Sequence, residues 1–208
     1  MIFNIMVKFF KENKIIAILR NIPFEKTIDV VKVAYLEGIK TFEVSLMSNK
    51  SIKQIEEIRN YFGTKIIIGA GTVVNIDLVK ASLDVGTDFI LSPSSDEKVL
   101  DFCRINSVNL IPGVFSPSDV SLCISYGYNL LKLFPANIFP INYIKDLKGP
   151  FPKTEYIAVG GVNEKNYKEF LNAGFIGVGI GSNLFPKEFI SNNDWKGLQK
   201  NISKYISP

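Results

Sequence analysis

Histidine is absent from the 208-residue chain. This absence removes the usual residue of imidazole-based acid–base catalysis, of serine and cysteine triads, and of ordinary zinc or iron sites. Proton transfer in any reaction must therefore fall to Asp, Glu, Lys, Tyr or water. We expect a protein that works without a metal and without a cofactor.

Cysteine is nearly absent too. Cys103 and Cys123 lie in separate predicted helices, and their spacing matches no metal-binding or redox motif. We interpret them as two free thiols, which are typical of the reducing cytosol. The expected location is therefore cytoplasmic.

A long hydrophobic run is also lacking. The most apolar stretch, residues 1–10, is interrupted by Asn4 and Lys8. It is too short to span a membrane, and no small-residue cleavage site follows it. We expect an N-terminal helix that packs on the body of the protein, and no membrane partner.

The chain carries little excess charge, with a formal net charge of +4. It has no basic cluster with interleaved aromatic residues, so we expect no nucleic-acid partner. A mild positive balance does suit small anionic substrates. The apolar content of 47% and charged content of 21% are those of a globular protein, and the length fits one domain over residues 1–208.

What the chain does contain is a regular alternation of short apolar runs and amphipathic segments, with strands starting roughly every 20 to 26 residues. This predicts an α/β fold of eight βα units, a single-domain (β/α)8 TIM barrel with an N-terminal helix. The competitor, a doubly wound open sheet, would need a glycine-rich turn after the first strand, and residues 19–23 (LRNIP) are not one. The predicted strands are 15–19, 41–46, 65–70, 89–92, 109–111, 130–134, 155–159 and 176–180. The predicted helices are 24–37, 51–62, 77–85, 96–106, 117–126, 142–147, 164–173 and 195–206.

Lys132 lies in the middle of an otherwise apolar strand. It shares one face with Leu130 and Phe134, and the opposite face is entirely apolar. Burial disfavours the ammonium form and lowers the pKa of a lysine. A neutral amine in an apolar pocket is a nucleophile that typically forms a Schiff base with a carbonyl substrate. The alternative is a lysine at a strand end whose ammonium group reaches solvent.

A carboxylate is predicted to face this lysine. Thr41, Glu43 and Ser45 share one face of the second strand, and in a barrel this polar face can point inward. Glu43 could simply neutralise the charge of Lys132, or it could act as a general acid–base. The two interpretations are compatible, and both place Glu43 beside Lys132.

Glycine-rich segments follow three strands. Residues 69–73 (GAGTV) include the Thr72 hydroxyl, which could bind a carboxylate or could cap a helix. Residues 159–163 and 177–183 follow the last two strands, where barrels of this kind bind phosphate through glycine amides and a short helix N-terminus. The alternative is a pair of tight turns. Arg20, at the end of the first strand, could add a fixed positive charge or lie on the rim with its head in water.

The residues together suggest an imine-forming enzyme that acts on a phosphorylated keto compound, with Glu43 moving protons. Two alternatives remain open. A phosphosugar isomerase or epimerase on the same scaffold would use Glu43 as a base and leave Lys132 as its charge partner. A binding module would hold a phosphorylated ligand without turnover.

Six short motifs resemble one known family, the bacterial class I aldolases that cleave 2-keto-3-deoxy-6-phospho sugar acids, the KDPG and KDPGal aldolases. The motifs occur in order over nearly the whole chain. They are residues 16–20 (IAILR), 42–46 (FEVSL), 69–73 (GAGTV), 131–135 (LKLFP), 158–162 (AVGGV) and 179–182 (GIGS).

The resemblance implies a homotrimer of (β/α)8 barrels that reversibly cleaves its substrate to pyruvate and glyceraldehyde 3-phosphate. Lys132 would form the imine and Glu43 would be the acid–base. Thr72 would hold the pyruvyl carboxylate, Arg20 would bind the substrate anion, and glycines with Ser182 would cradle the phosphate. The substrate-binding positions implied in this way are Arg20, Thr72, Pro93, Phe134, Gly160, Gly161, Gly181 and Ser182.

Two positions bear on the substrate. Val159 precedes the glycine pair, where the galactonate-type enzymes have valine and the gluconate-type enzymes usually have threonine. Residues 16–20 and 142–145 also resemble the galactonate branch more closely. Met47 stands where family members often have arginine or asparagine, and it supplies neither a charge nor an amide to a bound carboxylate. The choice between galactonate and gluconate, and cleavage of 4-hydroxy-2-oxoglutarate, stay open.

Overall fold

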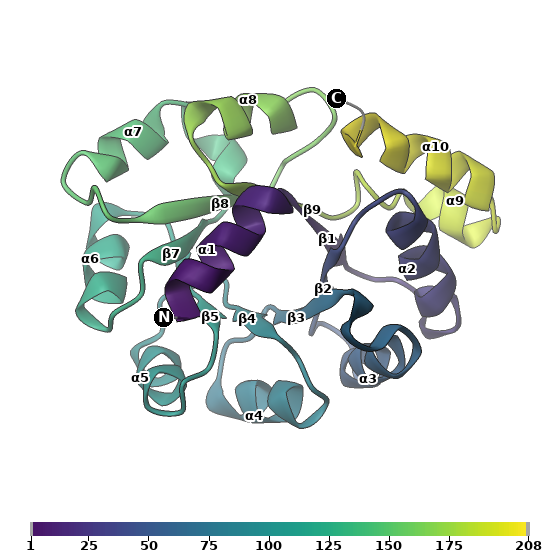
Figure 1. Cartoon of the computed structure of the whole chain (residues 1–208), viewed down its shortest axis with the longest axis horizontal. Helices are drawn as coiled ribbons and strands as arrows, with labels where there is room; N and C mark the ends of the chain where they lie inside the picture. The colour runs from purple at the N-terminus through teal and green to yellow at the C-terminus, as the bar shows by residue number, and fades with distance from the viewer. Residues whose placement is uncertain (1, 207–208) are drawn as a thin grey trace.

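The computed structural model describes residues 2–206, with the side chains of residues 6–206. Its centre is a parallel β-barrel in which the strands follow the order β5-β4-β3-β2-β1-β9-β8-β7-β6 (Figure 1). Every pair of neighbouring strands is parallel, as eight βα units require. The strands are β1 Ile15–Leu19, β2 Thr41–Ser45, β3 Ile67–Gly71, β4 Phe89–Leu91, β5 Leu110–Ile111, β6 Gly113–Val114, β7 Leu130–Leu133, β8 Glu155–Val159 and β9 Gly177–Ile180.

The predicted fifth strand is divided in two by Pro112. β5 pairs with β4, β6 pairs with β7, and the carbonyl of Pro112 accepts a 2.9 Å hydrogen bond from the Lys132 amide. Proline has no N–H to donate, so the ladder is interrupted there. The prediction ended this strand at Ile111, whereas the structure continues it as β6. The barrel therefore closes through Pro112, and the eight predicted units appear as nine strands.

Helices surround the barrel and connect successive strands (Figure 1). Helix α9 was not predicted, and α8 begins at Tyr167, three residues later than expected. The predicted helix 24–37 begins with a 3₁₀ turn, Phe24–Lys26, before α2. The helices are α1 Ile2–Glu12, α2 Thr27–Leu36, α3 Ser51–Phe62, α4 Ile76–Asp84, α5 Glu97–Ile105, α6 Pro117–Ser125, α7 Tyr143–Lys148, α8 Tyr167–Ala173, α9 Lys187–Ser191 and α10 Trp195–Ile206.

Side-chain caps explain where three helices begin. The carboxamide of Asn75 and the carboxylate of Asp96 accept hydrogen bonds from the first turns of α4 and α5. Ser116 and Asp119 form a reciprocal capping box at the start of α6. Such caps satisfy backbone N–H groups that have no partner within the helix. They fix the helices that follow β3, β4 and β6.

The apolar residues form two cores, as a barrel requires. An outer core fills the space between strands and helices, and an inner core fills the barrel. The two cores confirm that residues alternate inward and outward along each strand. The inner core consists of Phe10, Ile16, Ile18, Phe89, Leu91, Ile111, Leu130, Ile157, Val159 and Ile176.

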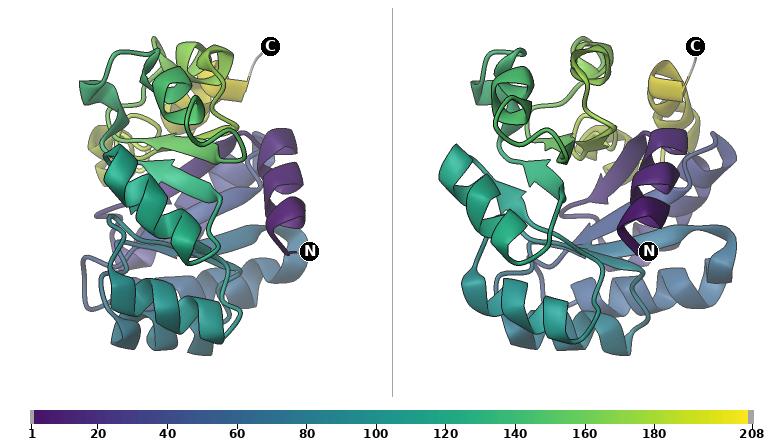
Figure 2. Two further views of the ribbon diagram at one scale, coloured as in Figure 1. Left: turned by 90° about the vertical axis from the view of Figure 1, so that its left-hand side faces the viewer. Right: turned by 60° about the vertical axis from the view of Figure 1, so that its left-hand side comes forward.

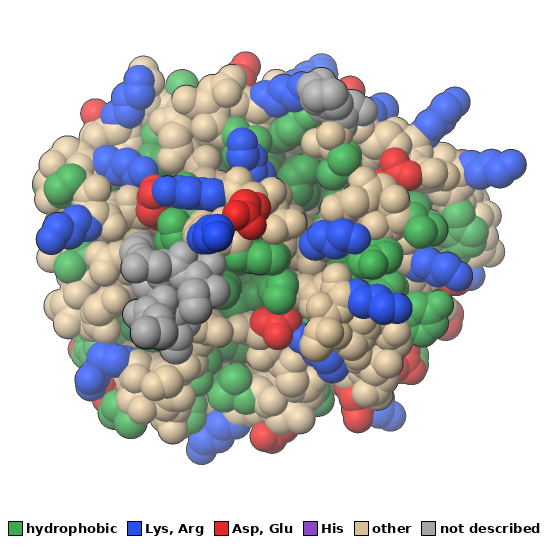
Figure 3. Space-filling model, in the orientation of Figure 1, with side chains coloured by type: hydrophobic (Ala, Val, Ile, Leu, Met, Phe, Trp, Pro, Cys, Tyr) green, Lys and Arg blue, Asp and Glu red, His purple; other side chains and the backbone are tan. Residues whose placement is uncertain are grey.

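Helix α1 closes the barrel at the N-terminal ends of the strands, as the predicted N-terminal helix suggested; Met1 lies outside the described residues (Figures 1 and 2). Phe10 is fully buried, and its ring meets Phe89 edge-on at 5.8 Å. On the face that carries α1, basic and acidic side chains are interspersed (Figure 3). The opposite end, where the strands terminate, is left for the polar side chains.

Removing the ring of Phe10 should therefore weaken the packing of α1 against the N-terminal end of the barrel. We expect Phe10→Ala to lower the free energy of unfolding by about 3–5 kcal/mol, because a buried ring is lost and a cavity remains. Urea unfolding measures this. Lys8→Ala, an exposed position on the same helix, is the control and should change stability by less than about 0.5 kcal/mol. A small effect of Phe10→Ala would show that α1 does not close the barrel.

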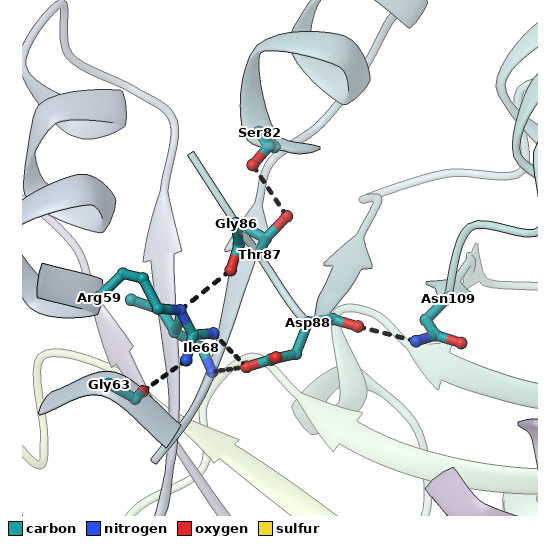
Figure 4. Close-up of polar contacts among 8 residues, drawn as sticks. All are labelled: Arg59, Gly63, Ile68, Ser82, Gly86, Thr87, Asp88 and Asn109. Carbon is teal, nitrogen blue, oxygen red and sulfur yellow. Dashed lines mark hydrogen bonds and ion pairs between the residues drawn. The ribbon is translucent and has the colours of Figure 1, made fainter. Parts of the chain in front are cut away.

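A polar network fixes the N-terminal edge of β3, β4 and β5. Arg59 donates to the carbonyl oxygens of Gly63 and Gly86 and to the Asp88 carboxylate at 2.6, 3.1 and 2.5 Å (Figure 4). The same carboxylate accepts from the Ile68 amide at 2.8 Å. Charge-assisted bonds of this kind are stronger than neutral ones.

Within residues 2–206, no helix combines the length and apolar character needed to cross a membrane.

Candidate active site

Lys132 is buried inside the barrel. It lies in β7 with 4% of its surface exposed, and its Nζ is 4.9 Å from the centre of the Phe134 ring. The alternative of a lysine that reaches solvent therefore does not hold. Burial lowers the pKa of Lys132, Glu43 opposes that change, and Arg20 adds to it. The amine is thereby shifted toward its neutral, nucleophilic form.

Glu43 is buried on β2 with 1% of its surface exposed. Burial raises its pKa, and this effect outweighs the opposing charges of Lys132 and Arg20. Its Oε2 is buried and has no hydrogen-bond partner among the described residues. A Cβ added to Gly71 would lie 1.5 Å from Oε1 of Glu43. Gly71 therefore makes the room in which the carboxyl group lies.

The lysine and the glutamate influence each other across the barrel. Each charge contributes to the pKa of the other group. Among the described residues, however, the two form no ion pair within 4 Å. Both pKa shifts are toward the uncharged forms, a neutral amine and a protonated carboxyl group. That is the pair needed for attack on a carbonyl followed by acid-assisted loss of water.

The backbone is strained just after β3, at Thr72, one residue beyond Gly71. Thr72 has φ of 61°, which is an outlier for a β-branched residue. Its Oγ1 is 2.7 Å from Oγ of Ser45, which is buried on β2 above Glu43. Strain of this kind persists where the surrounding structure enforces it, often at functional sites. Ser45 was not among the predicted site residues, although its place on the polar face of β2 is the signal that could have found it. Met47, two residues beyond Ser45, is 60% exposed.

The two glycine-rich loops lie next to each other. Gly160 and Gly161 have positive φ values of 100° and 69°, and a Cβ on Gly161 would lie 2.2 Å from the Asn137 side chain. Nδ2 of Asn183 donates to the carbonyl oxygen of Val162 at 2.8 Å and joins the loops after β8 and β9. Glycine is required here by both conformation and space. The loops after β8 and β9 are therefore adjacent, as the pairing of these two strands requires.

The loop after β9 differs from the prediction in one respect. We expected a short helix N-terminus there, but Gly181 begins a turn, in which its carbonyl accepts from the amides of Leu184 and Phe185 at 2.9 and 3.0 Å. Helix α9 begins only at Lys187. In the described part of the chain, the amide of Ser182 has no backbone acceptor. An anion at this position would be held by turn amides rather than by a helix dipole.

The remaining predicted positions lie around the mouth of the barrel. Arg20 follows β1 and is exposed, so its head lies on the rim while its charge still reaches Glu43 and Lys132. Pro93 follows β4 and is half-buried, as is Phe134 at the end of β7. All are at the C-terminal ends of strands, where active sites of barrels lie. The described residues hold no cluster of three or more Cys, Asp or Glu that could bind a metal ion.

The chain is similar in sequence to known proteins over most of its length. The family model described as KDPG and KHG aldolase matches residues 6–201. The 2-dehydro-3-deoxy-6-phosphogalactonate aldolase of Escherichia coli is 31% identical over 172 residues, which cover 82% of this chain and 84% of that protein. The 2-dehydro-3-deoxy-phosphogluconate aldolase of Pseudoalteromonas atlantica is 29% identical over 187 residues, which cover 89% and 86%.

A solved structure shows the same likeness in three dimensions. The crystal structure of the KDPG aldolase from Legionella pneumophila, with pyruvate captured as a covalent carbinolamine intermediate, is 30% identical. It superposes with a TM-score of 0.88 and covers 95% of this chain and 96% of that one. The family model spans most of the chain, and the relatives similar in sequence and the similar solved structure are all aldolases by name. The chain belongs to the KDPG and KHG aldolase family.

Proposed function

We propose that this protein is a class I aldolase that reversibly cleaves a 2-keto-3-deoxy-6-phospho sugar acid to pyruvate and glyceraldehyde 3-phosphate. The observation that carries the proposal is the buried Lys132, whose lowered pKa makes it a nucleophile, facing the buried Glu43. The family match does not favour the isomerase, epimerase or binding-module alternatives. A buried lysine and glutamate contribute little stability of their own, so a chemical role explains their presence better.

The reaction begins when the neutral amine of Lys132 attacks the C2 ketone and forms a carbinolamine. Glu43, directly or through a water molecule, protonates the leaving hydroxyl, and loss of water gives the iminium ion. The Glu43 carboxylate, directly or through a water molecule, then takes the proton of the C4 hydroxyl as the C3–C4 bond breaks, and the electron pair of that bond enters the enamine. The aldehyde leaves, Glu43 returns the proton to C3 of the enamine, and water releases pyruvate and the free amine.

Binding groups on both sides of Lys132 and Glu43 would orient the substrate. The hydroxyls of Thr72 and Ser45 lie above Glu43 and would receive the pyruvyl carboxylate. The loops that contain Gly160, Gly161, Gly181 and Ser182 would hold the phosphate, with Arg20 at the rim. The phosphate is remote from the reacting carbons, so its binding energy serves positioning. Pro93 and Phe134 would line the pocket between the two ends.

Reductive trapping tests the proposal. Incubation with pyruvate and borohydride, followed by peptide mapping in a mass spectrometer, should place a reduced pyruvyl adduct on Lys132. The adduct should be absent without borohydride, because the imine hydrolyses. A folded protein that forms no adduct would refute the imine chemistry. Parallel assays with the gluconate and galactonate phosphates, and with 4-hydroxy-2-oxoglutarate, would then assign the substrate.

The pH dependence offers a second test. Attack on the substrate requires an unprotonated Lys132 and a protonated Glu43, so kcat/KM, which reports the groups of the free enzyme, should follow a bell-shaped pH profile. Because burial lowers the lysine pKa and raises the glutamate pKa, the profile should reach its maximum well below the ordinary lysine pKa of 10.5. Activity that kept rising through that ordinary value would contradict a neutral amine in the resting site.

We further propose that the protein assembles as a homotrimer. Three apolar side chains are exposed around the ends of β6 and β7, namely Phe115 at 46%, Ile138 at 57% and Ile141 at 38%. Apolar surface of this kind is typical of contact with another chain. Sedimentation equilibrium should report three times the chain mass of 23.3 kDa. Cys103 and Cys123 are both free thiols, which supports the proposed cytoplasmic location.

A further inference from the structure

Two hydroxyl groups meet at the C-terminal ends of β2 and β3, where Oγ of Ser45 lies 2.7 Å from Oγ1 of Thr72. We propose that they act in series: Ser45 donates its proton to Thr72, and Thr72 thereby directs its own proton to the carboxylate of the keto acid. Ser45 is then a positioning residue, which acts through Thr72 and does not itself touch the substrate. The inference rests on the proposed function, because it concerns how the substrate of that reaction is held.

The burial of the two residues indicates which hydroxyl donates. Ser45 has 4% of its surface exposed, whereas Thr72 is half-buried. Within the described residues, Thr72 is the only hydrogen-bond partner of the Ser45 side chain. A buried hydroxyl proton without an acceptor is costly, so the proton of Ser45 is best placed on Oγ1 of Thr72. The proton of Thr72 is then left for a ligand.

The backbone of Ser45 is held from two sides. Its carbonyl oxygen accepts from the Met47 amide at 2.8 Å and from Oγ of Ser51 at 3.0 Å. Ser51 is buried and is the first residue of α3, so the end of β2 is tied to the start of that helix. On the other side, the amide of Leu46 donates to the carbonyl oxygen of Gly71 at 2.9 Å and ties β2 to β3. A residue locked in this way can hold a partner group in one geometry.

Thr72 depends on such support. Its φ of 61° is unfavourable for a β-branched residue, and such a conformation persists only where neighbouring contacts enforce it. A hydroxyl that accepts one hydrogen bond also becomes a stronger donor in the next, because hydrogen bonds in a chain polarise one another. The contact with Ser45 would therefore both orient the Thr72 hydroxyl and strengthen it as a donor.

The order of the strands favours an anionic ligand here. β2 lies between β1 and β3 and is hydrogen-bonded to both (Figure 1). Arg20 directly follows β1 and Thr72 directly follows β3, so a positive charge and a donor hydroxyl flank the end of β2. The charge of Arg20 also reaches Glu43 and Lys132. In a 2-keto acid the carboxylate is bonded directly to the ketone carbon, so a group that holds the carboxylate also places that carbon before Lys132.

Saturation of reductive trapping measures this role on the intact protein. The rate at which pyruvate and cyanoborohydride modify Lys132 is followed by mass spectrometry against pyruvate concentration in the parent, Ser45→Ala, Thr72→Val and the double variant. Ser45→Ala should raise the half-saturating pyruvate concentration about three- to tenfold, the range expected for one hydrogen bond, and change the rate at saturation by less than about twofold. In the Thr72→Val background, Ser45→Ala should have no further effect, because Ser45 acts through Thr72.

The other outcomes contradict the inference in distinguishable ways. Equal effects of Ser45→Ala in both backgrounds would show that Ser45 binds the carboxylate itself. An unchanged half-saturating concentration in Ser45→Ala, whether or not the rate at saturation falls, would show that Ser45 does not position a binding group. A parent protein that is not modified at all would refute the proposed function, and this inference with it.

Two further variants control for damage to the fold. Ser45→Thr keeps the hydroxyl and adds a methyl group that suits a strand, so it should retain the half-saturating concentration of the parent. Thr41→Val removes another buried hydroxyl from the same face of β2, one without a hydrogen-bond partner in the described part of the chain, and should also leave that concentration unchanged. A folded Ser45→Thr protein as impaired as Ser45→Ala would overturn the proposal. If Ser45→Thr fails to fold, the comparison of Ser45→Ala in the two backgrounds still decides.

Discussion

Lys132→Ala should lower kcat by at least about 10⁴-fold and abolish reductive trapping of pyruvate, because no other amine occupies the nucleophile's position. Trapping and turnover should be lost together. Lys145→Ala removes an exposed lysine of α7 and should retain both. A Lys132→Ala protein that still cleaved its substrate at a normal rate would show that the reaction does not pass through this imine.

Stability separates a chemical role of Lys132 from a structural one. The double variant Lys132→Met with Glu43→Gln removes both ionisable groups and keeps much of the volume. Since burying ionisable groups costs free energy, we expect this variant to be as stable as the parent or more stable by about 1–3 kcal/mol. It should be inactive. A marked loss of stability in urea unfolding would instead indicate that the pair is retained for structural reasons.

Gly71→Ala should displace the carboxyl group of Glu43 with a single added methyl group. The new Cβ would lie 1.5 Å from Oε1 of Glu43, so the carboxyl group must move. We expect kcat to fall by about 10²–10³-fold, since a displaced acid–base group loses most of its contribution. Overpacking should also lower the free energy of unfolding by about 1–3 kcal/mol.

The control for this change is Gly149→Ala. A methyl group at Gly149 would meet the carbonyl oxygen of Asp146 at 3.4 Å, and the backbone there is helical, with φ of −53°. Activity should be unaffected. In Gly71→Ala the trapping of pyruvate should slow while the protein remains folded by circular dichroism. Unchanged kcat in that variant would mean that Glu43 is not the proton carrier.

Much of the fold could be predicted because the patterns are local. The strand that contains Lys132 is apolar on both faces, and the strand that contains Glu43 is polar on one. These periodicities specify burial without reference to the rest of the chain. Repetition of the βα unit then favours the barrel, and the barrel places the ends of all strands at one edge. The loop glycines Gly160 and Gly161 were found for the same reason, because their conformational role is visible in the sequence.

Other features depend on contacts between distant segments. Nothing near Gly71 in the sequence indicates that its missing side chain makes room for Glu43, which lies 28 positions earlier. The hydrogen bond between Ser45 and Thr72 joins β2 to the residue that follows β3, so it appears only when β2 and β3 are aligned. The turn at Gly181 replaced the expected helix N-terminus because its carbonyl accepts two amides within the loop.

The sequence by itself determined the eightfold βα pattern, the buried amine and the carboxylate that faces it, since side-chain periodicity follows directly from backbone geometry. Tertiary structure alone decided the directions in which the pKa values of Lys132 and Glu43 shift, because desolvation depends on every atom packed around them. It also decided the break of the fifth strand at Pro112. The two halves of that strand pair with different neighbours, β5 with β4 and β6 with β7, which only the assembled barrel reveals.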